Sequence, residues 1–446
     1  MATVQTEVAT QIGEWLDERQ QRFITMADQI WAHPELGLAE HFACQLQADD
    51  LAAHGFTITP NIGGMPTAFM AEWSQGDGGP TIGFLGEYDA LPGLSQKNQE
   101  TQDAIVADGP GHGCGHNLLG TAALASAAVL KEWLIKEGRP ATVRYYGCPA
   151  EETLEGKIFM ARAGVFDDLD FALSWHPGYK TTVWAGSCLA MNSIKYRFLG
   201  RTAHAAANPE TGRSALDAVE LMNIGVNYLR EHTIDAARIH YVITRGGGAP
   251  NVVPDDCEVW YFIRAPKRTQ VIELTERIRK IAEGAALMTE TTHEEIFVSG
   301  CYELLPNDVL GDHLMTVLER LGPIDFTPDE VEYARTVSRS FPDELRNLIM
   351  EQERIPLDLV DEGLSGAVWP IDDRGIVLSG STDVADVAWI TPVGQVMTPT
   401  WPLGVPSHSW AATATGAMSI GHKGMMYAAR AMAVAAVDAV LDPDII

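Results

Sequence analysis

The chain has 446 residues, of which 46% are apolar and 20% are charged. This is the composition of a globular protein, and the length exceeds the ~250 to 300 residues at which one core usually splits, so we expect two domains. Sixty acidic against 31 basic residues give a formal charge of −29, which argues against nucleic acid and anionic membranes as partners because the field repels them.

The cysteines and the N-terminus predict a reducing cytoplasm. Six cysteines are scattered along the chain with no CxxC pair, which does not indicate a disulfide framework. Residues 1–20 have no basic start followed by an apolar stretch, so we expect no secretory signal. The most apolar segments, residues 122–130 and 428–441, are short or interrupted by charge, so we expect no membrane span.

Helix and strand patterns alternate through the first part of the chain. Residues 11–31 carry apolar residues at helical spacing and are followed by Pro34. A second helical stretch covers residues 118–137. Short apolar runs bounded by turn residues surround it, at 81–93, 142–152 and 171–178. This alternation predicts an α/β fold with a mostly parallel sheet covered on both faces.

The pattern changes at about residue 190 to that of a compact α+β domain. Two strand patterns and two helical patterns occur there, at residues 193–200, 257–265, 212–231 and 268–286. We therefore predict an inserted domain of residues 190–304 and a catalytic domain of residues 1–189 and 305–446. Residues 322–374 are acidic and weakly periodic, and we expect helices and loops there without assigning their position.

Reactive side chains follow the apolar run in each of the three predicted strands. Glu87 and Asp89 follow the first, Glu151 and Glu152 follow the second, and His176 ends the third. Because open parallel sheets bind ligands outside the carboxyl ends of their strands, we expect these side chains to meet in one crevice.

A glycine-rich loop, GPGHGCGHN at residues 109–117, adds Cys114 and His116 to this set. Its four glycines allow tight turns that direct both side chains to one point. Thiolate, imidazole and carboxylate together suit zinc or manganese. The set has more ligands than one ion needs, which indicates two ions.

Each of these residues has an alternative interpretation. His176 alone could be a structural histidine, and adjacent glutamates are usually surface residues. Cys114 could be the nucleophile of a hydrolase with His116 or His112 as its base, but that mechanism leaves the glutamate pair and His176 unused. A lone cysteine is most often a small buried side chain, which is our interpretation of Cys44, Cys148, Cys188, Cys257 and Cys301.

The sequence resembles a known family, the dinuclear-metal aminoacylases and carboxypeptidases. The strings that carry the resemblance run from about residue 31 to 430 in the family's order, and include WAHPELGLAEHFA, GPGHGCGHNLLGTAAL, PAEETLEGKIFMARAGVFDDLD, SWHPG, LGRTAHAAANPETGRSALDAV, GGGAPNVVPDDCEVWYFIRAP and VPSHSW. Within the family they are most similar to the branch of the aminobenzoyl-glutamate hydrolase B chain, which has hippurate and auxin-conjugate amidohydrolases among its relatives. The resemblance implies a metallopeptidase-like catalytic domain with an inserted lid and dimerisation domain.

The resemblance also implies roles for individual residues. Glu151 matches the general acid and base. Asp89 can orient a metal ligand through a hydrogen bond without binding the metal itself. His422 is a second, less favoured match for the last ligand. The metal ligands implied are Cys114, His116, Glu152, His176 and His408.

In the inserted domain the resemblance implies three further functional residues. His204 matches a lid histidine that stabilises the oxyanion and can come from the partner subunit, which predicts a homodimer. Asn251 and Arg264 match positions that bind the substrate carboxylate. The alternative for Arg264 is a surface salt bridge.

This chain departs from the family pattern at two positions. Glu87 stands where the cysteine-bearing branch has aspartate, and Asn117 stands where many relatives have aspartate. Whether Glu87 contacts metal, and whether the second ion is bound, are therefore left open.

We expect an amidohydrolase that cleaves N-acyl amino acids, with aminobenzoyl-glutamate as the first candidate substrate. Water activated by one or two divalent ions, Mn²⁺ or Zn²⁺, would attack the amide with Glu151 as base. The alternative is a non-catalytic subunit that binds a related A-type chain.

Overall fold

The computed structural model describes residues 2–445, with side chains from residue 6 onward. The chain forms two compact units. The larger comprises Met1–Gly186, Leu305–Ile376 and Val387–Ile446, and the smaller comprises Ser187–Leu304 and Val377–Asp386. The sequence pattern did not indicate that the short segment 377–386 belongs with the smaller unit.

The larger unit is built on a seven-stranded sheet with the order β1-β2-β4-β3-β5-β13-β6. Its centre is parallel, because β4 pairs with β3, β3 with β5 and β5 with β13 in parallel register, while the outer pairs are antiparallel. This confirms the predicted α/β class with a mostly parallel sheet. The strands are β1 (Thr57–Pro60), β2 (Phe69–Gln75), β3 (Thr81–Glu87), β4 (Ala141–Cys148), β5 (Phe171–Gly178), β6 (Thr182–Val183) and β13 (Val393–Pro399).

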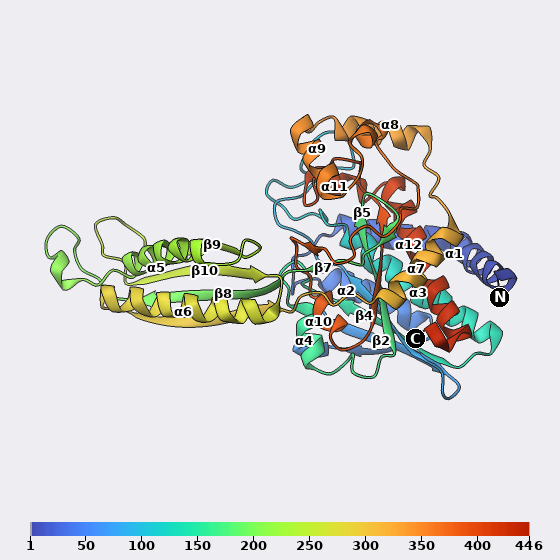
Figure 1. Ribbon diagram of the computed structural model, residues 1–446, viewed down its shortest axis with the longest axis horizontal. Coiled ribbons are helices and arrows are strands. Elements are labelled where there is room, and N and C mark those ends of the chain that lie inside the picture. The colour runs from blue at the N-terminus through green and yellow to red at the C-terminus, as the bar shows by residue number, and fades with distance from the viewer. Residues whose placement is uncertain (1, 446) are drawn as a thin grey trace. The chain divides into compact units, whose positions relative to one another are not determined.

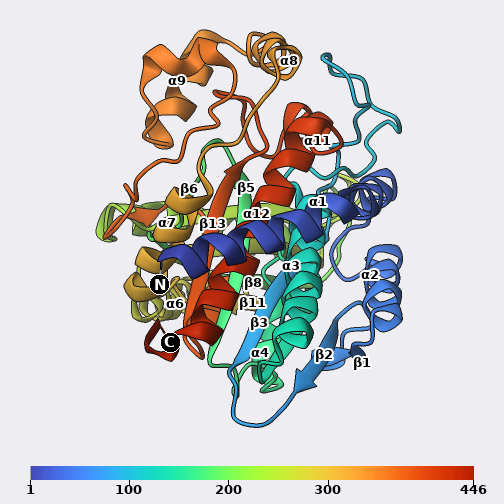
Figure 2. The ribbon, with the colours of Figure 1, turned by 90° about the vertical axis from the view of Figure 1, so that its right-hand side faces the viewer.

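Three long helices pack together over this sheet: α1 (Ala2–Ala32), α3 (His116–Glu137) and α12 (Ser419–Leu441) (Figure 2). The predicted helices 11–31 and 118–137 lie within α1 and α3. The two apolar segments that we expected to be too short for a membrane span lie in longer helices. By length and composition, α3 and α12 could cross a membrane. Their most apolar windows are 89% and 72% buried inside the protein, as in helices of a hydrophobic core.

The remaining helices of the larger unit are shorter. They include α2 (His41–Ala53), α4 (Gly156–Arg162), α7 (Asp308–Leu321), α8 (Pro328–Ser338), α9 (Asp343–Gln352) and α11 (Trp410–Thr415). The helices α8 and α9 account for much of the acidic segment 322–374. Thr327 caps α8 and forms a reciprocal capping box with Glu330, which is a strong start signal for a helix.

The smaller unit is a four-stranded antiparallel sheet, β11-β8-β10-β9, with two helices packed against it (Figure 1). Side chains alternate between buried and partly exposed along β10, as expected when only one face of a sheet is covered. The sequence predicted two of these strands and missed β9 and β11, which lie at the two edges. The elements are β8 (Ala190–Leu199), α5 (Ala215–Leu229), β9 (Arg238–Arg245), β10 (Asp256–Ala265), α6 (Arg268–Thr289) and β11 (Thr292–Cys301).

The glycine-rich loop is shaped by two different requirements. Gly115 has a φ of 83°, a left-handed conformation that glycine adopts readily, and it precedes the first residue of α3. Gly111 is needed for space, because a Cβ atom there would lie 2.0 Å from the carbonyl oxygen of Leu94. The loop therefore depends on close backbone approach as well as on tight turning.

We predict that Gly111→Ala lowers the free energy of unfolding by roughly 1 to 3 kcal/mol, the usual cost of overpacking. Denaturant unfolding of the metal-free protein measures this change. Gly311→Ala is the matched control, because it lies within α7 and a Cβ there meets nothing closer than 3.8 Å; it should be neutral or stabilising. Equal stability of the two variants would contradict this account of the loop.

Candidate metal centre

Potential metal ligands gather where the parallel strands of the larger unit end. Glu87 ends β3, Glu151 and Glu152 follow β4, and His176 lies near the end of β5. The register pairs Glu87 with Cys148, so the ends of β3 and β4 are level. The predicted convergence of these segments on one edge of the sheet is therefore present.

These side chains form three overlapping groups, in each of which the ligand atoms all lie within 4.8 Å of one another. Cys114 belongs to the first two groups, and His116 belongs to the first and the third. The groups are Cys114, His116 and His176; Cys114, Glu152 and His408; and Glu87, His116 and Glu151.

The separations between donor atoms suit shared ions. Cys114 Sγ lies 3.4 Å from His176 Nε2, and Glu152 Oε1 lies 3.6 Å from His408 Nε2. Two donors on one tetrahedral zinc ion are about 3.3 to 3.6 Å apart, given zinc bond lengths of about 2.0 to 2.3 Å. These separations fit a divalent cation at either of the two ligand groups that contain Cys114.

Two buried polar atoms of the cluster have no hydrogen-bond partner among the described residues. They are Nε2 of His116 and Oε1 of Glu152. A buried polar atom without a partner costs roughly 1 to 3 kcal/mol, and cations bound at the ligand groups that contain these atoms would satisfy them. This observation, independent of the distances, indicates that the residues fit a metal ion.

Asp89 fixes the orientation of two of these groups. His116 Nδ1 donates to Asp89 Oδ1 at 2.9 Å, and the backbone N–H of Glu152 donates to Asp89 Oδ2, also at 2.9 Å. Burial alone would raise the pKa of Asp89, but His116 outweighs it and the pKa is lowered. The ionised carboxylate therefore holds His116 with Nε2 directed into the cluster.

Two further candidate ligands, His176 and His408, are held in a form that can bind metal. His176 Nδ1 donates to the carbonyl oxygen of Pro177 at 2.7 Å, which leaves Nε2 free to face Cys114. Burial lowers the pKa of His176 to about 4, and burial together with His116 lowers the pKa of His408. Both imidazoles are therefore neutral at pH 7, as a metal ligand must be.

The environment of Cys114 argues against a nucleophilic role. Burial raises the pKa of its thiol far above the usual range, and Glu152 adds to this effect. A nucleophilic cysteine needs a lowered pKa, which a neighbouring cation or metal provides. His116 lowers the pKa of Cys114, but burial outweighs its effect, and His176, whose Nε2 lies 3.4 Å from the sulfur, has a lowered pKa and is a poor proton acceptor. A metal ligand is the better interpretation of Cys114.

Glu87 is engaged by a lysine that the sequence reasoning did not single out. Lys157, in the first turn of α4, places Nζ 2.6 Å from Glu87 Oε1, and its side chain is 0% exposed. The other oxygen of Glu87, Oε2, lies 3.3 Å from His116 Nε2. The only sequence signal for this contact is the position of Lys157, five residues after Glu152.

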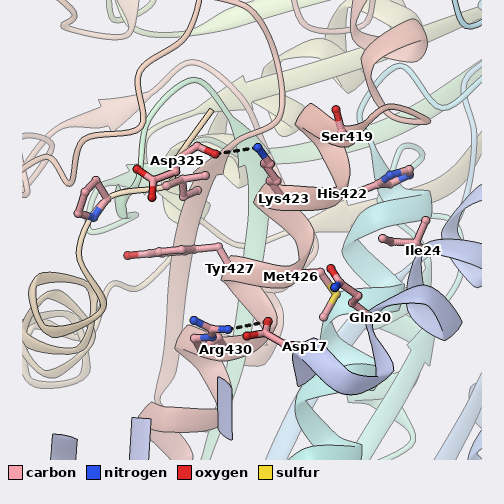
Figure 3. A pocket seen from close by; sticks show the side chains of 12 residues that line it. Asp17, Gln20, Ile24, Asp325, Ser419, His422, Lys423, Met426, Tyr427 and Arg430 are labelled. Atoms are coloured by element: carbon pink, nitrogen blue, oxygen red, sulfur yellow. Dashed lines mark hydrogen bonds and ion pairs between the residues drawn. The ribbon is translucent and has the colours of Figure 1, made fainter. Parts of the chain in front are cut away.

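The remaining histidines differ in their position. The backbone N–H of His408 donates to Gly113 at 3.1 Å, which ties its loop to the glycine-rich loop. His422 instead bonds Asp28 of α1 at 2.8 Å and lines a surface pocket on α12 (Figure 3). His112 is buried and its Nε2 lies 3.2 Å from the carbonyl oxygen of Ile30. Neither His422 nor His112 belongs to the ligand groups found among the described residues.

The three functional residues predicted in the inserted domain all lie in the smaller unit. His204 and Asn251 are exposed. Arg264 donates to Ser381 Oγ at 3.3 Å, and its Nε is buried without a partner. No carboxylate of the described residues pairs with Arg264, so the surface salt bridge considered as its alternative is absent there.

Comparisons with known proteins agree with this fold. Residues 190–289 match the model of a peptidase dimerisation domain. The chain is 44% identical to the B chain of p-aminobenzoyl-glutamate hydrolase from Escherichia coli (strain K12), over 98% of this chain and 92% of the relative. It is 33% identical to Xaa-Arg dipeptidase of Mus musculus, over 67% of this chain and 68% of the relative.

A solved structure shares the fold at low sequence identity. It is a dinuclear metal binding peptidase of the M20 family from Bacillus subtilis, with a TM-score of 0.61 and 18% identity over 95% of this chain and 99% of that one. Together these similarities define a hydrolase that acts on amide bonds. The chain belongs to the M20 peptidase family, as its sequence resemblance predicted.

We predict that Asp89→Asn weakens divalent-metal binding by about 10- to 100-fold, the usual cost of losing a group that orients a ligand. Isothermal titration of the metal-free protein with Mn²⁺ or Zn²⁺ measures the change. Asp28→Asn, which removes the negative charge beside His422, is the control and should bind metal like the wild type. Unchanged affinity in Asp89→Asn would refute the orienting role.

Proposed function

We propose that this protein hydrolyses the amide bond of N-acyl amino acids, with p-aminobenzoyl-glutamate as the first substrate to test. The name of the Escherichia coli relative supports this choice of substrate. The observation that carries the proposal is the pair of ligand groups that share Cys114, with unpartnered ligand atoms on His116 and Glu152. Such a site suits metal-assisted hydrolysis.

The ligands proposed for two divalent ions, Mn²⁺ or Zn²⁺, are Cys114, His116, Glu152, His176 and His408. When bound, such ions lower the pKa of water and polarise the carbonyl of the scissile amide. Asp89 orients His116 and the backbone of Glu152, so its contribution is to keep the ligands in position.

Glu151 is the proposed general base and acid. Its Oε2 lies 4.0 Å from His116 Nε2 and its side chain is 12% exposed, so it borders the candidate metal ligands and keeps a small exposed surface. In this role its carboxylate takes a proton from the attacking water and gives it to the leaving amine. Glu152, the next residue, is proposed as a metal ligand, so proton transfer and metal binding are carried out by different carboxylates.

His204 is the proposed donor to the oxyanion. Its Nδ1 accepts the backbone N–H groups of Ala206 and Ala207 at 3.2 and 3.1 Å. The neutral ring then carries its proton on Nε2, which is the atom able to donate to a developing negative charge. The match to a dimerisation domain supports a homodimer in which His204 serves the site of its partner.

Arg264 and Asn251 are proposed to bind the carboxylate of the substrate. Burial lowers the pKa of Arg264, yet an arginine stays charged at neutral pH, so the guanidinium is a buried charge without a carboxylate partner among the described residues. A substrate carboxylate can supply that partner through two parallel hydrogen bonds. This requirement favours acyl amino acids over neutral amides.

The alternative of a non-catalytic subunit has less support. A chain that served only to bind an A-type partner would not need Asp89 to hold His116, nor the carboxylate of Glu151 beside it. The prediction of a related A-type partner rests on the name of the Escherichia coli relative, which is one of two chain types, and it is compatible with a catalytic chain.

We predict that Glu151→Gln binds the same amount of metal as the wild type and loses about 100- to 10,000-fold in kcat, the usual contribution of a general base. Elemental analysis and hydrolysis of p-aminobenzoyl-glutamate measure the two quantities. Glu155→Gln, in the same loop, is the control and should retain activity. Full turnover in Glu151→Gln would remove this residue from the mechanism.

We predict that Arg264→Met raises KM for an acyl-glutamate by at least about tenfold, because a charged hydrogen bond contributes about 1.5 to 3 kcal/mol. Initial rates over a range of substrate concentrations measure this. A substrate whose α-carboxylate is replaced by an amide should be cleaved poorly by the wild type and be little affected by the substitution. An equal loss for both substrates would show that Arg264 does not bind the carboxylate.

A further inference from the structure

Lys157 is a buried charge that the proposed mechanism does not use. Lysine is almost never fully buried unless it is paired, and here Nζ meets Glu87 Oε1 at 2.6 Å with side-chain exposures of 0% and 3%. A lysine in the first turn of a helix is also unfavourable, because the positive end of the helix dipole lies there. The position of Lys157 therefore does not serve the stability of α4.

The buried pair is a weak source of stability for the fold as well. Replacing a buried ion pair by apolar residues of similar size is often neutral or stabilising, because desolvation of both charges offsets their attraction. Removing only one partner is costly, since the other charge is left uncompensated. A role at the metal centre gives a reason for keeping the pair.

Lys157 determines what Glu87 can do at the metal centre. With Oε1 bound by the ammonium, Oε2 is held 3.3 Å from His116 Nε2. That nitrogen makes no hydrogen bond with the described residues, and it lies within ion-pair distance of Glu87 Oε2, so a cation bound by His116 would lie beside this carboxylate. Glu87 is thus fixed beside the proposed ion, with part of its charge offset by Lys157.

We propose that Lys157 is a positioning residue of the metal centre, which acts through Glu87. Lys157 holds the Glu87 carboxylate beside the ion bound by His116. By offsetting part of its charge, Lys157 also makes this carboxylate a weaker ligand for that ion. A further ligand with a full negative charge would reduce the ability of the ion to lower the pKa of bound water. With its charge partly offset, Glu87 leaves this ability in place. This inference rests on the proposed metal-dependent function.

The inference predicts opposite effects of two single substitutions on metal affinity. Lys157→Met leaves an uncompensated carboxylate, so it should bind Mn²⁺ about 10- to 100-fold more tightly and lower kcat with little change in KM. Glu87→Gln leaves an uncompensated ammonium beside the ion, so it should bind Mn²⁺ more weakly by a similar factor. Because the double variant removes both charges and leaves neither uncompensated, its affinity should return toward that of the wild type.

The experiment is a calorimetric Mn²⁺ titration of the metal-free wild type, the two single variants and the double variant, together with thermal unfolding of each. Lys131→Met is the matched control, because Lys131 is a largely buried lysine of α3 that bonds the carbonyl oxygen of His54. It should lower stability without changing the affinity for Mn²⁺.

The possible results are distinguishable. Opposite shifts that cancel in the double variant support the inference. If Lys157→Met lowers the melting temperatures of the metal-free and loaded proteins equally and leaves the Mn²⁺ affinity unchanged, the pair is only structural and the inference is overturned. The inference is also overturned if the two single substitutions shift the affinity for Mn²⁺ in the same direction. A wild type that binds no Mn²⁺ would instead refute the proposed function.

Discussion

The hydrogen bond from His116 to Asp89 is the interaction on which the rest of the centre depends. It is fully buried, it fixes the tautomer of the imidazole, and it leaves Nε2 directed at Glu87 and Glu151. Through its second oxygen, Asp89 also holds the backbone of Glu152. One carboxylate therefore links the end of β3, the start of α3 and the segment after β4.

This link is possible because of the parallel arrangement at the centre of the sheet. Parallel neighbours place their carboxyl ends at the same edge, so Asp89, Glu152 and His176 lie at this edge, at or just beyond the ends of β3, β4 and β5. The glycine-rich loop then approaches from the start of α3, and close backbone contact at Gly111 gives it a defined path. The ligand groups are thus a consequence of the topology and of a few small residues.

The sequence predicted the parts of this account that depend on strong local patterns. The central strands carry continuous apolar runs that end in reactive residues, so their class and the convergence of Glu87, Glu151 and His176 could be predicted. The edge strands β9 and β11 were missed because they are largely exposed and carry charged residues such as Glu294 and Glu295, which weakens the alternation that marks a strand.

The contact between Lys157 and Glu87 could not be predicted for a different reason. It joins two residues 70 positions apart through a short helix, and nothing in the local pattern of either segment indicates it. The lowered pKa values of His176 and His408 likewise depend on burial, which the sequence does not specify residue by residue. The candidate ligands could be identified from the sequence, whereas their protonation and orientation depend on the contacts that the fold creates.

The most direct test of the central claim is anomalous diffraction from crystals grown with Mn²⁺ or Zn²⁺, recorded at the absorption edge of the metal. The account predicts two peaks among Cys114, His116, Glu152, His176 and His408, with the sulfur of Cys114 between them and Nε2 of His116 directed at one. Ions bound elsewhere, such as at the pair of His422 and Asp28, with no peak beside His116, would contradict it.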